Sequence, residues 1–230
     1  MSMWYSFTEI LVPLGTVEWL EGIRASCAIE SKPVRRLQYP IFIMGLFHYQ
    51  MACADAIWHM FVEPKASHNG VNSLYQQACS VRPYDSGRIG SKPRFRLMHD
   101  LVHQCASARM LDCWRVEVTW RDTSVQSLSD YAAQKPSWDA IVDLSYCLAT
   151  KYLDSSDTAD IEVQNNTLIL GCLVHYVELC HAMKHGDIGR VEQSFMHWVV
   201  VFKSVGKHKY ATHIVKMVND MHYIYPDHLA

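Results

Sequence analysis

The spacing of apolar residues is clearest in the last third of the chain, where it predicts three consecutive helices. Residues 163–185 have a helical pattern that ends at Gly186, because glycine adopts a left-handed backbone after a helix at the lowest cost. Asp187 is then the predicted N-cap of the second helix, and Gly206 separates that helix from a third, which ends before Pro226. Turns this short require neighbouring helices to run antiparallel, which predicts a C-terminal antiparallel three-helix stack.

A different pattern precedes these helices. Residues 39–47 form a short, continuous apolar run rich in strand-forming residues, and residues 48–62 follow with helical spacing. Further helices are predicted over 97–120 and 124–134, and Ser137 is the predicted N-cap of another. The sequence therefore predicts a mainly α-helical fold with one short strand–helix unit and the C-terminal stack.

The chain of 230 residues is long enough for one large domain or two small ones. Residues 1–33 are poorly patterned, although 7–11 and 17–23 can each form a short helix or strand. Residues 34–230 are predicted to form a single mainly helical domain. The acidic, polar segment 154–162 is the candidate internal boundary.

Composition narrows the classes of function. Half of the residues are apolar and 19% are charged, which argues against disorder. This balance also indicates apolar surface that is covered by a partner, either a missing N-terminal region or a second copy of the chain. The net charge of −2 provides no overall basic field, so a nucleic-acid partner is not supported by charge.

The cellular location is predicted from the lack of membrane-spanning and signal-peptide patterns in the sequence. The apolar runs at 41–47 and 199–202 are far shorter than the roughly 20 residues that cross a bilayer, and the N-terminus has no signal-peptide pattern. The eight cysteines are scattered singly, with no Cys-x-x-Cys pair, which favours a reducing compartment. We therefore expect no membrane association and a cytoplasmic or nuclear location.

Two groups of histidines are candidate metal ligands. His99 and His103 lie four residues apart, the spacing with which two imidazoles on a helix bind Zn²⁺, but the sequence shows no third ligand nearby. His175, Glu178 and His181 would supply a two-histidine, one-carboxylate site for zinc or iron. The structural alternatives are histidines spaced by chance and a solvated helix face.

Basic and acidic residues suggest two further kinds of site. Arg88, Lys92 and Arg94 fall in a predicted long loop over 83–95, where they would contact phosphate or nucleic acid, or simply face solvent. Two-metal phosphoryl transfer with Mg²⁺ needs converging carboxylates, for which the candidates are Asp187, Glu192, Asp55 and Asp100. Helix capping explains Asp187, and the helix dipole explains Glu192, without any chemistry.

Ordered blocks of sequence resemble the C-terminal part of an uncharacterised domain family that is expanded in mushroom-forming fungi, over about residues 34–229. The blocks are Arg35–Pro40, Gly45–His48, Met51–Trp58, Ile89–Pro93, Leu111–Arg115, Lys135–Trp138, Gly186–Glu192 and Gly206–His213. That family resembles transposon-derived proteins with a ribonuclease-H-like catalytic core.

The resemblance implies a truncated or inactive descendant of such a core. In wider relatives we expect a catalytic acid in a Gly-Asp-aromatic-His block, where this chain has Leu46, and leucine cannot bind Mg²⁺. The first expectation is therefore a non-catalytic remnant or interaction domain without a cofactor. The alternatives are a metal-dependent nuclease or strand-transfer enzyme and a helical metal-binding protein, with Mg²⁺ or Zn²⁺ as the corresponding ion.

Overall fold

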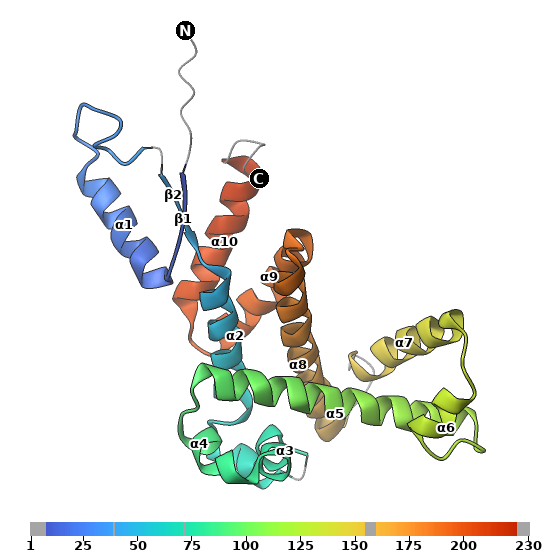
Figure 1. Ribbon diagram of the computed structural model, residues 1–230. Helices are drawn as coiled ribbons and strands as arrows, with labels where there is room; N and C mark the ends of the chain where they lie inside the picture. Colours follow the sequence, from blue (N-terminus) through green and yellow to red (C-terminus); the bar gives the residue numbers. More distant parts are fainter. Residues whose placement is uncertain (1–7, 39, 71, 155–159, 225–230) are drawn as a thin grey trace. The chain divides into compact units, whose positions relative to one another are not determined.

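The computed structural model describes residues 8–38, 40–70, 72–154 and 160–224 (Figure 1). Over these residues the chain is mainly α-helical, as predicted, with ten α-helices, two short 3₁₀ helices and two strands. No helix in these ranges is apolar over a stretch long enough to cross a membrane. The chain divides into two compact units, residues 1–56 with 182–230 and residues 57–181, and each is described by itself.

The first unit contains a two-stranded parallel sheet. Strand β1 (Thr8–Val12) pairs with β2 (Pro40–Met44), with Ile10 opposite Phe42, and helix α1 (Leu14–Ser26) connects the two (Figure 1). The strand expected within 39–47 is confirmed as β2. The poorly patterned segment 1–33 contains β1 and α1, so the chain has a strand–helix–strand unit rather than one strand and a helix. The partner of β1 lies about thirty residues away, and such pairing leaves no local signal.

Helix α2 (Leu46–Phe61) begins directly after β2, and its part up to Ala56 belongs to the first unit together with α9 (Ile188–Ser204) and α10 (His208–Tyr223). The core of this unit is aromatic: the ring of Tyr49 packs edge-on against Phe195 and Phe202, with centroids 5.3 and 6.0 Å apart. Ion pairs join α10 to α1, with Lys209 Nζ 2.9 Å from Glu18 Oε2 and Lys216 Nζ 2.7 Å from Glu21 Oε1.

The predicted ends of the C-terminal helices are confirmed. Gly186 and Gly206 have φ of 68° and 75°, the left-handed conformation that ends α8 (Ile161–His185) and α9. The Asp187 side chain accepts a hydrogen bond from the Arg190 N–H at 3.1 Å and so caps α9. Helix α8 belongs to the second unit up to His181, so the three helices do not form one compact unit.

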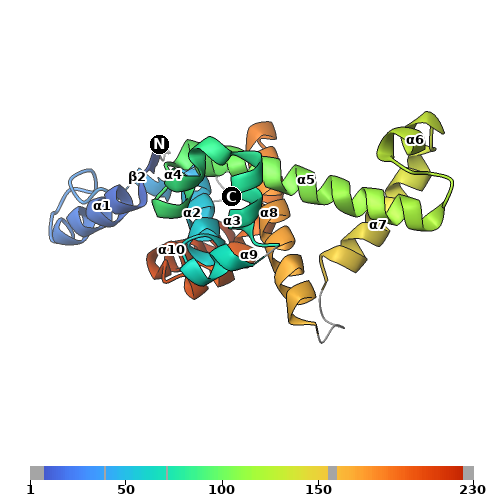
Figure 2. The ribbon, with the colours of Figure 1, turned by 90° about the horizontal axis from the view of Figure 1, so that it is seen from below.

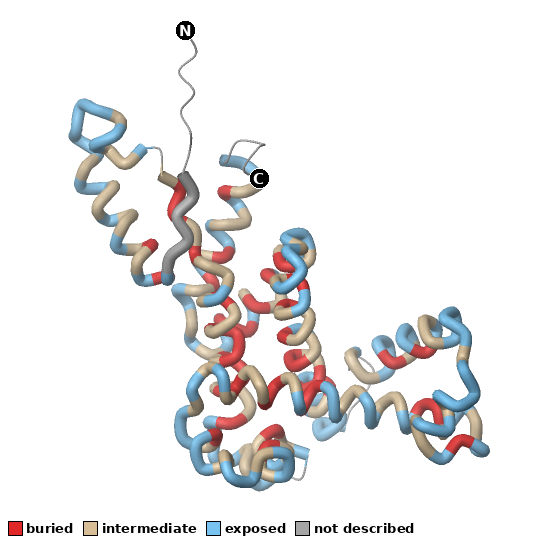
Figure 3. The backbone as a smooth tube through the Cα atoms, in the orientation of Figure 1, coloured by how far each residue is buried: buried red, intermediate tan, exposed pale blue. Residues whose placement is uncertain are grey.

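The second unit is built around α5 (Phe95–Arg121) and the main part of α8. Helices α6 (Leu128–Ala133) and α7 (Trp138–Tyr152) follow the C-terminal end of α5 (Figure 2). The predicted cap is confirmed, because Ser137 Oγ accepts a hydrogen bond from the Ala140 N–H. Figure 3 shows buried residues along α8 and, separately, between α5 and α7, where a small core consists of Val118, Val125, Leu144 and Leu148.

The remaining helices of this unit are short. They are the 3₁₀ helices η1 (Lys65–Asn69) and η2 (Pro83–Asp85), and α3 (Leu74–Val81) and α4 (Ser86–Ser91). The long loop expected over 83–95 is therefore wrong in part. Pro83 starts η2, and buried Ile89, whose carbonyl accepts a hydrogen bond from Trp58 Nε1 at 2.7 Å, holds α4 in place. Of the predicted boundary segment 154–162, residues 155–159 lie outside the described residues.

Candidate metal site

The N-terminal half of α5 presents two imidazoles from one face. Along this half of the helix the buried residues are Met98, Leu101, Val102, Cys105 and Ala106. His99 and His103 lie four residues apart beside that buried stripe and are half-buried. A spacing of four residues on a helix brings side chains together, and the two ring centroids are 4.5 Å apart.

Helix α8 contributes a thiol at the same place. The ligand atoms of His99, His103 and Cys180 all lie within 4.8 Å of one another, and no other group of three His, Cys, Asp or Glu residues in the described part of the chain meets that criterion. Cys180 is half-buried, and none of the eight cysteines, all in described positions, is in a disulfide. The site therefore brings together two imidazoles and one thiol from two helices.

Hydrogen bonding and burial prepare both imidazoles for a metal. His99 Nδ1 is 2.9 Å from the hydroxyl of the fully buried Tyr176, one turn before Cys180, so Nε2 is the nitrogen left to face an ion. His103 Nε2 is buried without a hydrogen-bond partner. Burial, and then the neighbouring His99, lowers the pKa of His103, while Asp100 opposes the shift. A neutral imidazole with an unpartnered nitrogen is the form that binds a metal.

The spacing can be compared with what zinc requires. Zn–N and Zn–S bonds of about 2.0–2.1 and 2.3 Å in a tetrahedron place ligand atoms about 3.3–3.8 Å apart. The three ligand atoms are within 4.8 Å of one another, so side-chain movements of about 1 Å would close the site. Three protein ligands satisfy all but one position of a tetrahedral ion. The residues present fit a transition metal such as Zn²⁺.

The other histidine candidates lie further along one helix. His175 and His181 are exposed on α8 and Glu178 is half-buried between them. Their ligand atoms do not form a group as close as that of His99, His103 and Cys180. The structure thus places a third ligand beside His99 and His103 of α5, but it does not bring the α8 residues His175, Glu178 and His181 into a comparably close group.

The carboxylates considered for two-metal chemistry are engaged in other contacts. Asp187 caps α9, Glu192 pairs with His222, and Asp55 pairs with Lys207, all within the first unit. Asp100 belongs to the second unit, where its carboxylate is 3.6 Å from Arg82 Nη2. Leu46 is the first residue of α2.

The basic candidates are placed around α4. Arg88 is 81% exposed in its side chain and lies 3.7 Å from Asp85. Lys92 is the C-cap residue of α4 and Arg94 the N-cap residue of α5, and both are exposed. The structure therefore keeps these three side chains on the surface of one short segment.

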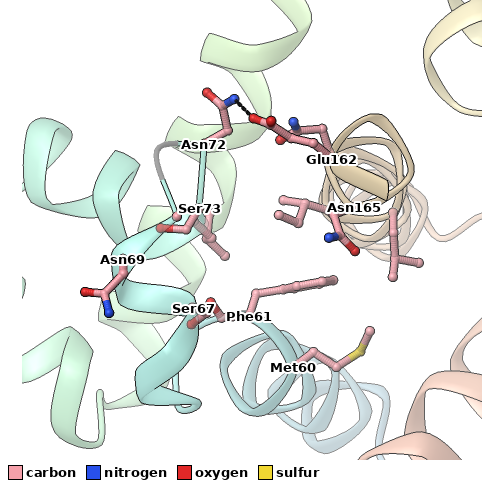
Figure 4. Close-up of a pocket in the computed structure, with 13 residues that line it drawn as sticks. Met60, Phe61, Ser67, Asn69, Asn72, Ser73, Glu162 and Asn165 are labelled. Carbon is pink, nitrogen blue, oxygen red and sulfur yellow. Dashed lines mark hydrogen bonds between the residues drawn. The ribbon is translucent and has the colours of Figure 1, made fainter. Parts of the chain in front are cut away.

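A cavity of about 670 Å³ is the second candidate site of this unit. It lies between the end of α2, η1, the start of α3 and the first turns of α8 (Figure 4). Its floor is apolar, with Met60, Phe61, Leu74 and Ile169, and its rim is polar. At the rim, Asn72 Nδ2 donates a hydrogen bond to Glu162 Oε1 at 2.7 Å.

Sequence reasoning missed Cys180 and the whole cavity. One signal for Cys180 was available: Tyr176 and Cys180 repeat on α8 the spacing of four that His99 and His103 have on α5. Which face of α8 meets which face of α5 is a tertiary fact that no local pattern contains. The cavity combines residues from 60 to 169, and it likewise depends on how helices pack.

Comparison with known proteins gives a family and no function. A family model described as a family of unknown function (DUF6589) matches residues 13–230. No curated protein matches the chain. No solved structure matches it either.

Proposed function

The chain belongs to the DUF6589 family, a family of unknown function, so we propose a function from the geometry of the site. We propose that residues 57–181 form a metal-binding unit in which His99, His103 and Cys180 hold one Zn²⁺ ion. The observation that carries the proposal is the convergence of three ligand atoms from two helices, together with the buried, unpartnered Nε2 of His103. Buried polar atoms without partners are rare in folded proteins, and an ion is one of the standard reasons for them.

The chemistry of the donors selects the metal. Imidazole nitrogen and thiolate sulfur suit Zn²⁺, whereas Mg²⁺ requires oxygen ligands. Binding would remove the Cys180 proton, because the thiolate is the form that coordinates. His99 would coordinate through Nε2 while Nδ1 stays bonded to Tyr176, an arrangement that fixes the ring and raises its affinity for the ion.

The role that we propose for the ion is structural. It would link α5 to α8 inside the second unit, with water or a partner's side chain at the fourth position. Support for a non-catalytic chain comes from the acids: Asp55 pairs with Lys207, Glu192 contacts the His222 imidazole and Asp187 is used as a cap. Descent from a transposon-encoded fungal protein, with the interaction role that it implies, is a further part of this proposal.

Metal analysis of the purified chain tests the proposal. We expect about one equivalent of zinc per chain and, after exchange for Co²⁺, a thiolate-to-cobalt charge-transfer band. Cys180→Ser should abolish the band and lower the zinc content, as should His103→Ala. Cys27→Ser and His185→Ala, outside the site, should retain both. Zinc-free wild-type protein that gains no cobalt spectrum, or an unchanged spectrum in Cys180→Ser, would overturn the proposal.

A further inference from the structure

The cavity of the second unit has a size and lining suited to a small molecule. Its volume of about 670 Å³ lies within the roughly 300–1,000 Å³ of small-molecule sites. Figure 4 shows the ring of Phe61 extending across the cavity floor, between η1 and helix α8, with Asn165 above it. Leu168 and Ile169 of α8 also line the cavity, and with Phe61 they provide an apolar surface that accepts a flat hydrocarbon or aromatic body.

Charge at the rim has one sign. Glu162 is the one charged side chain among the described residues that line the cavity. Asp160 lies beside it and caps α8, accepting a hydrogen bond from the Glu162 N–H at 2.8 Å. The two carboxylates more than offset the partial positive charge of the α8 N-terminus, so the rim favours a cation.

Arg109 donates hydrogen bonds to two residues that line the cavity, but it does not change that sign. Arg109 lines the neighbouring polar cleft rather than the cavity. Its guanidinium donates to Gln77 Oε1, to Asn166 Oδ1 and to the Asn72 carbonyl oxygen. Those contacts hold Asn72 in position, and Asn72 in turn donates to Glu162. A carboxylate accepts several hydrogen bonds, so Glu162 retains capacity for a ligand.

We propose that this cavity binds an organic amine with a flat apolar body, of the arylalkylamine class. The ammonium group pairs with the Glu162 carboxylate, and the aromatic body lies against Phe61 and Ile169. The Asn165 amide forms hydrogen bonds with polar atoms of the ligand's ring system. Anionic ligands are disfavoured because they would bring a negative charge to Glu162. The site is separate from His99, His103 and Cys180, and it requires no metal.

Three probes that share an indole ring distinguish the contribution of ligand charge to the affinity from that of ligand shape. Tryptamine carries an ammonium group, tryptophol a hydroxyl group and indole-3-acetate a carboxylate. We expect tryptamine to bind about tenfold more tightly than tryptophol, and indole-3-acetate more weakly than both, because a charge-assisted hydrogen bond forms only with the amine. Methyl resonances of Met60 and Ile169, which line the cavity, should shift on titration and so report binding at this site.

Two variants and a matched control complete the test. Glu162→Gln should remove the preference for tryptamine over tryptophol, and Asn165→Trp, on an exposed helix position, should fill the cavity and abolish binding of both. Glu178→Gln, on the same helix but outside the cavity, should bind all three probes as the wild type does. Equal affinity for the three probes, an unchanged preference in Glu162→Gln, or no methyl shifts with any probe would overturn the proposal.

Discussion

His99 Nδ1 and the hydroxyl of Tyr176 lie 2.9 Å apart, and this contact joins α5 to α8 next to the proposed zinc ligands. Tyr176 is fully buried, so its hydroxyl needs a partner inside the protein, and His99 supplies it. The same bond fixes the orientation of the imidazole and occupies Nδ1, so that Nε2 is the nitrogen left for a metal; the ring centroid of His103 is 4.5 Å away. A hydrogen bond of this kind is typical of histidines that bind a metal, because it fixes the orientation of the ring.

Tyr176→Phe tests that positioning. The variant keeps the aromatic packing but removes the hydrogen bond to His99, so we expect zinc affinity to fall by about tenfold while binding remains at one equivalent. Competition with a chromophoric chelator measures the affinity. Tyr146→Phe, at a position that is 69% exposed on α7, should leave it unchanged. A variant with wild-type affinity would show that Tyr176 does not orient His99.

Glu117 is the most buried carboxylate among the described residues of the second unit, and its contacts lead to a prediction about pH. Its side chain is 2% exposed and contacts Lys151 Nζ at 2.8 Å and Arg121 Nε at 3.1 Å. The hydrogen bond from Lys151, and then that from Arg121, lowers the pKa of Glu117 despite burial, which opposes the shift. Because the folded pKa lies below the unfolded value of about 4.3, this stabilisation is present above about pH 4.3 and is lost as the pH falls through the folded pKa.

Glu117→Gln should therefore lower the free energy of unfolding by about 1–3 kcal/mol at neutral pH, since a charge-assisted contact between α5 and α7 is lost. The difference from wild type should shrink as the pH falls below about 4.3 and vanish below the folded pKa, where the wild-type carboxylate is protonated as well. Urea denaturation of the variant and the wild type between neutral and acidic pH measures the difference in the free energy of unfolding and its change with pH. Asp112→Asn, which breaks an exposed pair with Arg115, should cost less than about 0.5 kcal/mol. A constant difference at every pH would show that packing, not charge, accounts for the loss.

Local signals in the sequence predicted the local parts of the fold. Ser137 and Asp187 as caps, Gly186 and Gly206 as left-handed helix ends and residues 39–47 as a strand all depend on chemistry within a few neighbouring residues. Such features are set by hydrogen bonds to the nearest backbone groups and can be read without knowledge of the tertiary structure.

Features that join distant segments could not be predicted in this way. Strand β1 depends on β2, about thirty residues later, and Cys180 reaches His99 and His103 only through the packing of α8 on α5. The cavity has the same origin, since Phe61 and Glu162 are a hundred positions apart in the chain. The candidate histidines of α5 were visible from their spacing, whereas the residue that completes their site was not.

Tyr49 tests the aromatic core of the first unit. It is fully buried and packs edge-on against Phe195 and Phe202, and its hydroxyl is 3.3 Å from Ser194 Oγ. We expect Tyr49→Ala to lower the free energy of unfolding by about 3–5 kcal/mol, because it leaves a large cavity. Tyr49→Phe should cost less than about 1.5 kcal/mol, because it loses one hydrogen bond. Equal losses in the two variants would contradict a packing role for the ring.

Two glycines, one after α8 and one within it, should respond to alanine with opposite signs. Gly186 has φ of 68°, where an alanine side chain is strained, so Gly186→Ala should lower the free energy of unfolding by about 1–2 kcal/mol. Gly171 lies inside α8 with ordinary helical geometry, and a Cβ atom built there meets no atom within 4 Å. Gly171→Ala should therefore raise the free energy of unfolding by about 0.5–1 kcal/mol, since alanine has the higher helix propensity. Chemical denaturation of both variants measures the difference. A loss of stability in Gly171→Ala would show that another part of the protein approaches the helix there, and no loss in Gly186→Ala would mean that α8 does not end in a left-handed residue.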